Sequence, residues 1–393
     1  MSTDHFFIEL HRHSEAKLKI LDNYLVPWMR KITMGSFGAE RALVIDGFAG
    51  AGSYGNSDGS SIRLIKHAID FCEQADANNR KRPQLLILLI EGNEENYQEL
   101  LKNIYRVTSL DLSEEKGYIP IPDYPSIQIS CRFGKFDEVL KSRLDNLGTR
   151  ETLIPSFCFI DPFGFKDTPF EIIKRYLKNE KSEILLNFIY EETNRFITAK
   201  NEKVKAHMQR HLGLDDIDSV QEMVKGKSAT ERKQLIVDLY SRQLLDNTNV
   251  KHILSFEIKK DGRTKLILFY GTKSMEGLKV MKKAMWKVDD TGLYMFDDRK
   301  DPNQIEFQFT KELNDNALLD DLCDILTDSL SGKILSINEV EEFVLTQTIY
   351  PLENFCKKVL KKIENKDGFH NVTNKNGKRN RGTFPPGTVM HFK

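Results

Sequence analysis

Cysteine is scarce in this sequence, and the few that occur form no recognisable pattern. The chain of 393 residues contains five cysteines, which lie far apart and include no C-x-x-C pair. This spacing predicts neither a zinc site nor a disulfide framework. Cys158 lies within an apolar run, so we expect it to be a small buried hydrophobe. Such cysteine usage is typical of a reduced, cytoplasmic protein.

An excess of charge of either sign is also missing. Lys and Arg together number 58, as do Asp and Glu, so the net charge indicates no class of partner. Any surface that binds nucleic acid must therefore be local. No apolar run reaches the length that spans a membrane, and the polar N-terminus lacks the core of a signal peptide. We expect no membrane association and a cytoplasmic location.

Apolar strands and helices alternate over much of the chain. The continuous apolar run at 84–91 is typical of a strand that is buried on both faces. Further strands are predicted at 42–46, 126–130, 157–161 and 183–188. Asp261-Gly262 between two apolar runs predicts a closing antiparallel hairpin, and a last strand is expected at 293–296 or 305–309. The alternation predicts an α/β fold with a doubly wound, mostly parallel sheet.

The length of the chain and its changes in composition predict more than one structural unit. We expect an N-terminal helical segment over 1–40, packed on the sheet, and a sheet domain over 41–312. A charged helical insertion is predicted within that domain at 190–246. Residues 313–393 indicate three helices and a basic hairpin, an order that is typical of a winged helix.

The most informative segment is an apolar strand that ends in an acid and a glycine-rich turn. It reads Leu43-Val44-Ile45-Asp46-Gly47-Phe48-Ala49-Gly50-Ala51-Gly52. Glycine lets the backbone adopt positive φ and come close to a ligand, and nucleotide-type cofactors bind at the carboxyl ends of strands in open α/β sheets. The predicted cofactor-binding residues here are Asp46, Gly47, Phe48, Ala49, Gly50 and Gly52.

The same segment indicates which cofactor to expect. Gly55 completes a G-x-G-x-x-G match, but a predicted loop follows it, and the next helix is expected to begin with Ser60 or Ser61 as its N-cap. The Asp46 carboxylate would face the phosphates of a dinucleotide, whereas it suits a cation such as the amino end of a methionine. Asp-x-Phe-x-Gly-x-Gly resembles the first motif of S-adenosylmethionine-dependent methyltransferases. S-adenosylmethionine is the expected cofactor; a nicotinamide cofactor and a turn without a ligand are the alternatives.

Two later strand ends add to this predicted site. Glu91 ends the second buried strand, where its carboxylate can accept hydrogen bonds from both hydroxyls of a ribose; a solvent-facing acid is the alternative. The third strand is followed by Gly134-Lys135-Phe136-Asp137. Many methyltransferases have an Asp where Lys135 stands, so the adenine contact is left open. Phe136 is either a purine-stacking residue of the cofactor site or the first core residue of the next helix.

A second motif follows the fourth buried strand, and it reads Asp161-Pro162-Phe163-Gly164-Phe165. It resembles the Asp-Pro-Pro-Tyr/Phe motif of methyltransferases that act on exocyclic amino groups of adenine or cytosine, although Phe163 replaces a proline and Gly164 the aromatic. Asp161 and the Pro162 carbonyl can hold the hydrogens of a weakly nucleophilic amino group. We predict Asp161, Pro162 and Phe163 as catalytic and Phe165 as substrate-binding, with one aromatic stacked on a flipped base. A turn with buried aromatics is the alternative.

No residues show the spacing of metal ligands. His207 and His211 lie one helical turn apart, but no third ligand is evident, so no metal is predicted. His13 and Lys17 also lie one turn apart, on the first helix. They can reach a cofactor carboxylate or a substrate phosphate, or they form a solvated polar face.

The C-terminal part carries the local basic charge that the whole chain lacks. Residues 357–381 hold nine Lys or Arg against two acids. We predict that Lys378, Arg379 and Arg381 contact nucleic-acid phosphates from a flexible wing. A solvated charged face is the alternative, and a winged helix can also bind protein.

Several segments together resemble one family, the three-Cys-motif partner proteins, over nearly the whole chain. They are His13-Ser14-Glu15-Ala16-Lys17 with Tyr24, Leu25 and Trp28; Asp46-Gly47-Phe48-Ala49-Gly50 with Gly59 and Ser60; Asp161-Pro162-Phe163-Gly164; and Ala284-Met285-Trp286-Lys287-Val288-Asp289. The resemblance implies a bacterial protein with a methyltransferase-like domain, often encoded beside a partner that carries a three-cysteine motif. It implies no particular substrate.

Two functions follow from these observations. The leading hypothesis is an S-adenosylmethionine-dependent methyltransferase that modifies an exocyclic amino group of a base in DNA or RNA. The alternative is a non-catalytic module that keeps the cofactor fold and recruits nucleic acid or a partner within a bacterial multi-protein system. The altered motif after Asp161 is the main support for the alternative.

Overall fold

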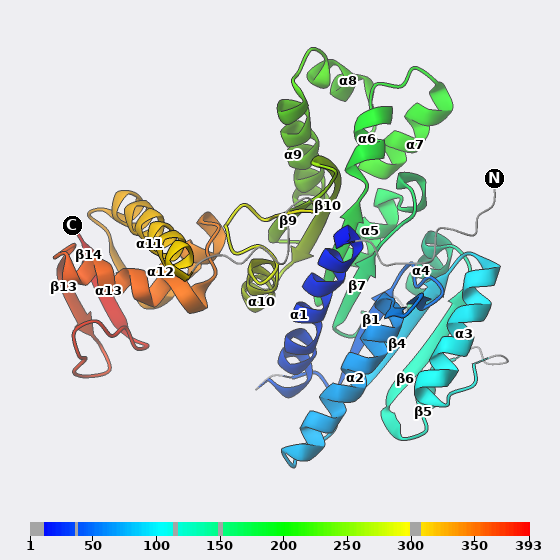
Figure 1. Ribbon diagram of the computed structural model, residues 1–393, viewed down its shortest axis with the longest axis horizontal. Coiled ribbons are helices and arrows are strands. Elements are labelled where there is room, and N and C mark those ends of the chain that lie inside the picture. The colour runs from blue at the N-terminus through cyan, green and yellow to red at the C-terminus, as the bar shows by residue number, and fades with distance from the viewer. Residues whose placement is uncertain (1–11, 36–37, 113–116, 148–151, 299–307) are drawn as a thin grey trace. The chain divides into compact units, whose positions relative to one another are not determined.

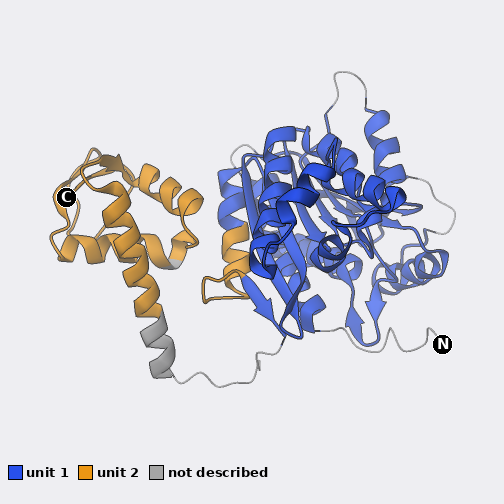
Figure 2. Cartoon of the chain, turned by 90° about the horizontal axis from the view of Figure 1, so that it is seen from above, with its two compact units in different colours: residues 1–280, 295–299 blue, residues 281–294, 300–393 orange. Residues whose placement is uncertain are grey.

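The computed structural model describes residues 12–35, 38–112, 117–147, 152–298 and 308–393. The chain divides into two compact units (Figure 2). Unit 1 comprises residues 1–280 and 295–299, and unit 2 comprises residues 281–294 and 300–393. The boundary that the sequence predicted near 312 falls inside a helix of unit 2, α11 (Gln308–Leu330).

Unit 1 is built on a mixed sheet, whose described part has nine strands in the order β11-β9-β10-β8-β7-β1-β4-β6-β5 (Figure 1). The strands are β1 (Arg41–Asp46), β4 (Gln84–Glu91), β5 (Ile119–Ile121), β6 (Tyr124–Phe133), β7 (Ser156–Ile160), β8 (Ser182–Phe188), β9 (His252–Lys260), β10 (Arg263–Thr272) and β11 (Met295–Asp297). Strands β6, β4, β1, β7 and β8 are parallel to one another. Strand β10 is antiparallel to both of its neighbours. This is the class I methyltransferase type of α/β fold, which confirms the fold predicted for the sheet domain; the winged helix predicted for the C-terminal part stays a prediction.

Helices cover both faces of this sheet (Figure 1). On one face lie α1 (Arg12–Met34), α2 (Ser60–Ala77) and α3 (Glu94–Thr108). On the other lie α4 (Phe136–Asp145) and α5 (Phe170–Leu177), which follows the 3-10 turn η2 (Phe165–Asp167). Between β8 and β9, where the insertion was predicted, the chain forms α6 (Tyr190–Phe196), α7 (Glu202–Leu212), α8 (Asp218–Val224) and α9 (Ala229–Asn247). No helix in the described ranges is both long and apolar enough to cross a bilayer.

Two predicted elements differ from the structure. The loop predicted at 53–60 contains a small antiparallel hairpin, β2 (Ser53–Tyr54) and β3 (Ser57–Asp58). Helix α2 begins at Ser60 with Gly59 as its N-cap, so the predicted serine N-cap was wrong. Of the two positions offered for the last strand, 293–296 overlaps β11. In the other, 305–307 lie outside the described residues and 308–309 belong to α11.

Unit 2 contains helices and a small antiparallel sheet of order β12-β14-β13. After the second half of α10 (Met275–Trp286) and after α11, its elements are β12 (Ile334–Ser336), α12 (Ile337–Gln347), the π-helical turn η3 (Leu352–Cys356), α13 (Lys357–Asn365), β13 (Phe369–Asn374) and β14 (Thr388–Phe392). The side chains of Leu326, Val344, Val359 and Phe392 are among those buried in its core. Removing such apolar area from water is the main source of its stability.

A buried lysine ties together part of unit 2. Lys282 is 1% exposed, and its Nζ donates to the carbonyl oxygens of Val344, Leu345, Thr348 and Tyr350 at 2.6 to 3.1 Å. These carbonyls lie at and beyond the end of α12, where a helix leaves its last acceptors unpaired. Burial lowers the pKa of Lys282 to about 7. The four acceptors oppose that shift, because the ammonium has three protons to donate and the neutral amine has two.

We expect the Lys282→Met variant to be less stable than the wild type by about 3 kcal/mol, since it leaves buried carbonyls without a donor. Urea unfolding followed by circular dichroism measures this loss. The matched control is Lys283→Met, whose side chain is half exposed and forms an ion pair with Glu353 at 3.2 Å. That variant should lose no more than about 0.5 kcal/mol. Equal losses in the two variants would contradict the role given to Lys282.

Candidate functional site

Three carboxylates gather at the carboxyl edge of the parallel strands. Asp46 ends β1, Glu91 ends the neighbouring strand β4, and Asp161 directly follows β7 on the other side of β1. Asp46 is 0% exposed and Glu91 is 3% exposed. Burial raises the pKa of Asp46 to about 7; hydrogen bonds oppose the shift, and repulsion from Asp161 and Glu91 adds to it. The site is therefore strongly electronegative.

Glu91 holds the glycine-rich turn that follows β1. Its Oε2 accepts the Gly50 N–H at 2.8 Å, and its Oε1 accepts the Asn93 N–H at 2.7 Å. Gly50 has a φ of 61° and Gly52 a φ of 84°, a region that side chains other than glycine disfavour. The glycines thus let the turn curl back far enough for a backbone N–H to reach the carboxylate of the next strand.

The turn is also fixed to the strands on both sides of β1. The Gly47 N–H donates to the Phe159 carbonyl at 2.9 Å, and the Ala49 N–H donates to the Ile90 carbonyl at 2.9 Å. Asn103 donates from its side chain to the Ala51 carbonyl at 2.8 Å. These bonds make the turn a rigid part of the sheet edge.

Phe136 lies beneath this turn. It is 2% exposed, and its ring centroid is 5.4 Å from that of Phe48. A Cβ added to Gly47 would lie 2.6 Å from the same ring, which explains the glycine. The structure therefore places Phe136 in the core, the second of its two predicted roles, and a purine cannot stack on a ring that is covered in this way.

Two serines and a tyrosine complete the surroundings of Asp46. Ser60 donates from Oγ to Oδ2 of Asp46 at 2.7 Å, and Ser61 donates to the Ala49 carbonyl at 3.1 Å. These bonds explain why neither hydroxyl caps α2. Tyr54 was missed by sequence reasoning. Its hydroxyl lies against Gly50, since a Cβ added to that glycine would be 3.1 Å from the hydroxyl oxygen. Burial raises the pKa of Tyr54, and the charges of the three carboxylates raise it further. No sequence signal marked Tyr54, because its segment was predicted to be loop.

Asp161 is paired with two donors. Lys17 of α1 forms an ion pair with Oδ2 of Asp161, and Asn187 of β8 donates from Nδ2 to Oδ1 at 2.5 Å. Asn187 is 3% exposed, and its own Oδ1 is buried without a hydrogen-bond partner among the described residues. Lys17 therefore lies at the site rather than on a solvated face, and its partner there is Asp161; the predicted contact with a cofactor carboxylate or a substrate phosphate stays a prediction. Asn187 was not singled out from the sequence, although a polar residue in the apolar strand 184–188 could have marked it.

A second lysine lies close to the Lys17–Asp161 pair. Lys265 of β10 has its Nζ 3.1 Å from Nε2 of His13. Burial lowers the pKa of Lys265; the charges of Lys260 and Lys17 lower it further, while those of Glu191 and Asp161 act in the opposite direction. No feature of the sequence distinguished this lysine from the other basic residues of the hairpin.

The remaining residues of the second motif separate into buried and exposed groups. Pro162 is buried, whereas Phe163 is 71% exposed. Phe165 is buried, with its ring centroid 5.8 Å from that of Phe196 and 5.7 Å from that of His211. Of the two aromatics, only Phe163 is open to a substrate, and Phe165 belongs to the core rather than to a binding surface.

His211 is also part of the core. It stacks on Phe188 with a centroid distance of 5.0 Å, and burial lowers its pKa to about 4. Its ring nitrogens lie within 3.4 to 3.5 Å of oxygens of Thr168 and Thr193. Within the described ranges, no group of three or more His, Cys, Asp or Glu side chains is placed to hold a metal ion.

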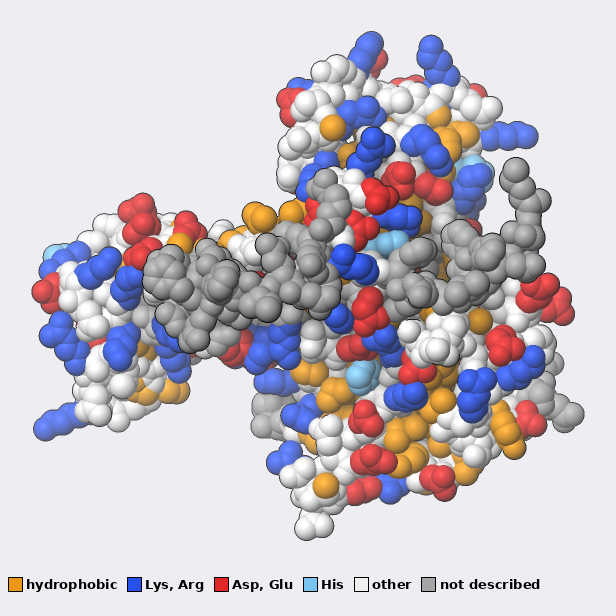
Figure 3. Space-filling model, viewed as in Figure 1, with side chains coloured by type: hydrophobic (Ala, Val, Ile, Leu, Met, Phe, Trp, Pro, Cys, Tyr) orange, Lys and Arg blue, Asp and Glu red, His pale blue; other side chains and the backbone are white. Residues whose placement is uncertain are grey.

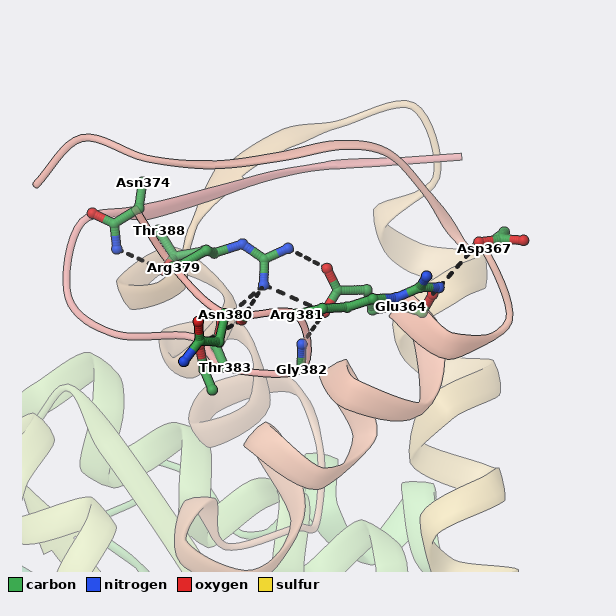
Figure 4. Close-up of polar contacts among 9 residues, drawn as sticks. All are labelled: Glu364, Asp367, Asn374, Arg379, Asn380, Arg381, Gly382, Thr383 and Thr388. Carbon is green, nitrogen blue, oxygen red and sulfur yellow. Dashed lines mark hydrogen bonds and ion pairs between the residues drawn. The ribbon is translucent and has the colours of Figure 1, made fainter. Parts of the chain in front are cut away.

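The predicted phosphate-binding residues of unit 2 differ in their surroundings (Figure 4). Arg379 points to the Glu364 carboxylate and pairs with it, and both side chains are almost buried. It also donates to the Thr383 carbonyl at 3.0 Å. Arg381 is exposed and lies 3.4 Å from Asp367, and Lys378 is exposed. Arg379 is therefore occupied inside the unit, which removes it from the predicted set of phosphate contacts.

The residues around the glycine turn fit a cationic ligand that also carries hydrogen-bond donors. Asp46 and Glu91 supply the acceptors. A sulfonium with an amino group matches this set, because opposite charges attract strongly where water is partly excluded. A pyrophosphate would meet carboxylates instead, which disfavours the nicotinamide alternative.

No protein-family model matches the chain, and no curated protein matches its sequence. Among solved structures, Trm1 from Pyrococcus horikoshii in complex with S-adenosyl-L-methionine is 12% identical over 72% of this chain and 62% of that one, with a TM-score of 0.38. This chain thus covers less than two thirds of Trm1. The O-methyltransferase from Bacillus cereus in complex with SAH is 13% identical over 69% of this chain and 94% of that one, with a TM-score of 0.32.

Human methyltransferase-like protein 13, also in complex with SAH, is 10% identical over 77% of this chain and 100% of that one, with a TM-score of 0.33. Likenesses of this strength carry no argument about ligand or substrate. The class of fold follows from the strand order of this chain itself, in which the antiparallel β10 lies between β8 and β9.

The raised pKa of Asp46 makes the affinity for a cationic ligand depend on pH. At pH 6 most of the ligand-free protein carries a protonated Asp46, and at pH 7.5 most of it carries the carboxylate. We expect S-adenosylmethionine to bind about five- to tenfold more tightly at pH 7.5 than at pH 6. Calorimetric titration at the two pH values measures this ratio. The Asp46→Asn variant should bind S-adenosylmethionine weakly at both pH values. If this variant keeps the wild-type ratio of affinities, Asp46 is not the group that makes binding depend on pH.

We expect Arg379→Ala to destabilise unit 2 by about 3 kcal/mol, because it leaves the Glu364 carboxylate buried without its cation. Lys378→Ala is the control, since Lys378 is exposed on the same connection and should cost no more than about 0.5 kcal/mol. Thermal unfolding of the full chain reports both. If the two variants unfold alike, the Arg379–Glu364 pair does not stabilise the unit.

Proposed function

We propose that this protein is an S-adenosylmethionine-dependent methyltransferase that acts on nucleic acid. The observation that carries the proposal is the convergence of Asp46, Glu91 and Asp161 on the glycine turn. Asp46 would hold the amino end of the methionine moiety, and Glu91 the ribose hydroxyls, since each carboxylate oxygen can accept a second hydrogen bond. The bound donor would supply an electrophilic methyl group. Asp161 would face the acceptor.

Unit 2 supports a nucleic-acid substrate. Its order of helices and strands fits a winged helix, in which α13 would be the recognition helix and the β13–β14 connection the wing. Exposed lysines on these two elements are Lys357, Lys358, Lys361, Lys375 and Lys378. On the face shown in Figure 3, Lys and Arg side chains lie among Asp and Glu side chains, so any binding surface is a local one. Contacts from such lysines would make binding weaken steeply with salt.

The finer parts of the proposal come from the sequence. The Asp161-Pro162-Phe163 motif suggests an exocyclic amino group as the acceptor, with the exposed Phe163 ring available to stack on a base. The resemblance to three-Cys-motif partner proteins suggests a second protein that carries three cysteines. Both remain predictions.

We expect Asp161→Ala to lose methyl transfer and to keep affinity for the cofactor within about threefold, because Asp161 faces the acceptor rather than the donor. Radiolabelled methyl transfer to mixed DNA and RNA and calorimetric titration measure the two properties. Asp145→Ala, at an exposed ion pair with Arg175, is the matched control and should retain both. A fully active Asp161→Ala would refute the assignment.

A wild-type protein that binds the cofactor but transfers no methyl group to DNA or RNA would support the alternative, a binding module without catalysis. A protein that binds no S-adenosylmethionine would refute both versions, because each depends on the carboxylate site.

A further inference from the structure

We propose that the methyl acceptor is a hydroxyl oxygen, namely a ribose hydroxyl of RNA, and not an exocyclic amino group, with Lys265 as the proton acceptor. The inference rests on the proposed function and specifies its substrate class. Three features carry it: the two donors on Asp161, the ammonium of Lys17, and the Lys265 amine beside His13.

The surroundings of Asp161 do not suit an amino acceptor. Such an acceptor is stabilised by negative charge, because positive charge develops on its nitrogen as the methyl group arrives. Here Asn187 and Lys17 already donate to the two oxygens of Asp161. The Lys17 ammonium also cancels the negative charge and would repel a nitrogen that becomes cationic.

The same groups suit a hydroxyl acceptor. A hydroxyl becomes a strong nucleophile only as it loses its proton, and the oxygen is then negatively charged. The Lys17 ammonium, held in place by Asp161, is a fixed positive charge that stabilises this oxygen. The acceptor site thus has electrostatics of the opposite sign from the donor site around Asp46.

Lys265 is the group that can take the proton. Its Nζ lies 3.1 Å from the Nε2 of His13, and burial lowers its pKa. Lys260 of β9 and Lys17 of α1 favour the neutral amine, whereas Glu191 of α6 and Asp161 favour the ammonium. A lowered pKa brings the neutral amine within easier reach, and the neutral amine is the form that can act as a general base.

The hydroxyl oxygen forms a bond to the methyl carbon, the carbon–sulfur bond breaks with its electron pair remaining on sulfur, and the hydroxyl proton passes to Nζ of Lys265. The products are a methyl ether on the ribose, a neutral thioether and a lysine ammonium, which returns its proton to water. No oxidant, reductant or metal is required.

The first test identifies the product. RNA and DNA oligonucleotides of the same sequence are incubated with the protein and labelled S-adenosylmethionine, digested to nucleosides and analysed by mass spectrometry. We expect label in ribose-methylated nucleosides from RNA and none from DNA. Label in a base-methylated nucleoside would overturn this inference and leave the proposed function intact. No label in either, whether or not the cofactor binds, would overturn both.

The second test uses variants of Lys265, the proposed proton acceptor, and of Lys260. Lys265→Arg keeps the positive charge but cannot lose its proton at neutral pH, so kcat should fall by about a hundredfold or more, with KM within about threefold. Lys260→Met, a change at an exposed lysine outside the acceptor site, should keep the maximal rate. Because it removes a repelling charge, it should shift the rising limb of the pH–rate profile to higher pH. A Lys265→Arg variant with the rate of the wild type would contradict the role of Lys265.

A third experiment does not require the methyl donor S-adenosylmethionine. Acylation of lysine amines in the ligand-free protein at several pH values, followed by peptide mass spectrometry, gives the pKa of each lysine. We expect the pKa of Lys265 to lie below the ordinary value for a lysine, and the Lys260→Met variant to raise it. A Lys265 that titrates with the exposed lysines would contradict its role as the base.

Discussion

Three carboxylates at one edge of a parallel sheet repel one another, and the structure around them depends on how that repulsion is balanced. Glu91 is compensated by two backbone N–H groups, one from Asn93 and one from Gly50, whose positive φ lets the turn reach the carboxylate. Asp46 receives a serine hydroxyl, and Asp161 receives a lysine and an amide. The side chain that donates to Asp46 is neutral, whereas one of the two that donate to Asp161 is a cation. This difference divides the site into an end that attracts cations and an end that tolerates anions.

The sequence predicted the sheet well because its signals are local. The apolar run 84–91 corresponds to β4 with the same bounds, and the Asp-Gly pair lies at the turn between β9 and β10. Asp46 and Glu91 could be found because each ends an apolar strand, and parallel strands bring their carboxyl ends to one edge. The small hairpin after Gly52 was missed because two-residue strands leave no periodic pattern.

The pairing of side chains could not be predicted in the same way, because it depends on contacts between segments far apart in the sequence. Lys17 and Asp161 are separated by 144 positions, and His13 and Lys265 by 252. The basic tail shows the same limit. Arg379 and Lys378 are adjacent and chemically alike, yet one pairs with a buried glutamate and the other is exposed. A count of charges in the segment cannot distinguish them.

The stacking of His211 links the helical insertion to the site. His211 of α7 and Tyr240 of α9 pack on Phe188, and Phe188 directly follows Asn187, which contacts Asp161. The insertion therefore shares its interior with the strand that shapes the acceptor end. Removing these helices would expose the Phe188 ring and leave Asn187, the residue before it, less firmly held against Asp161.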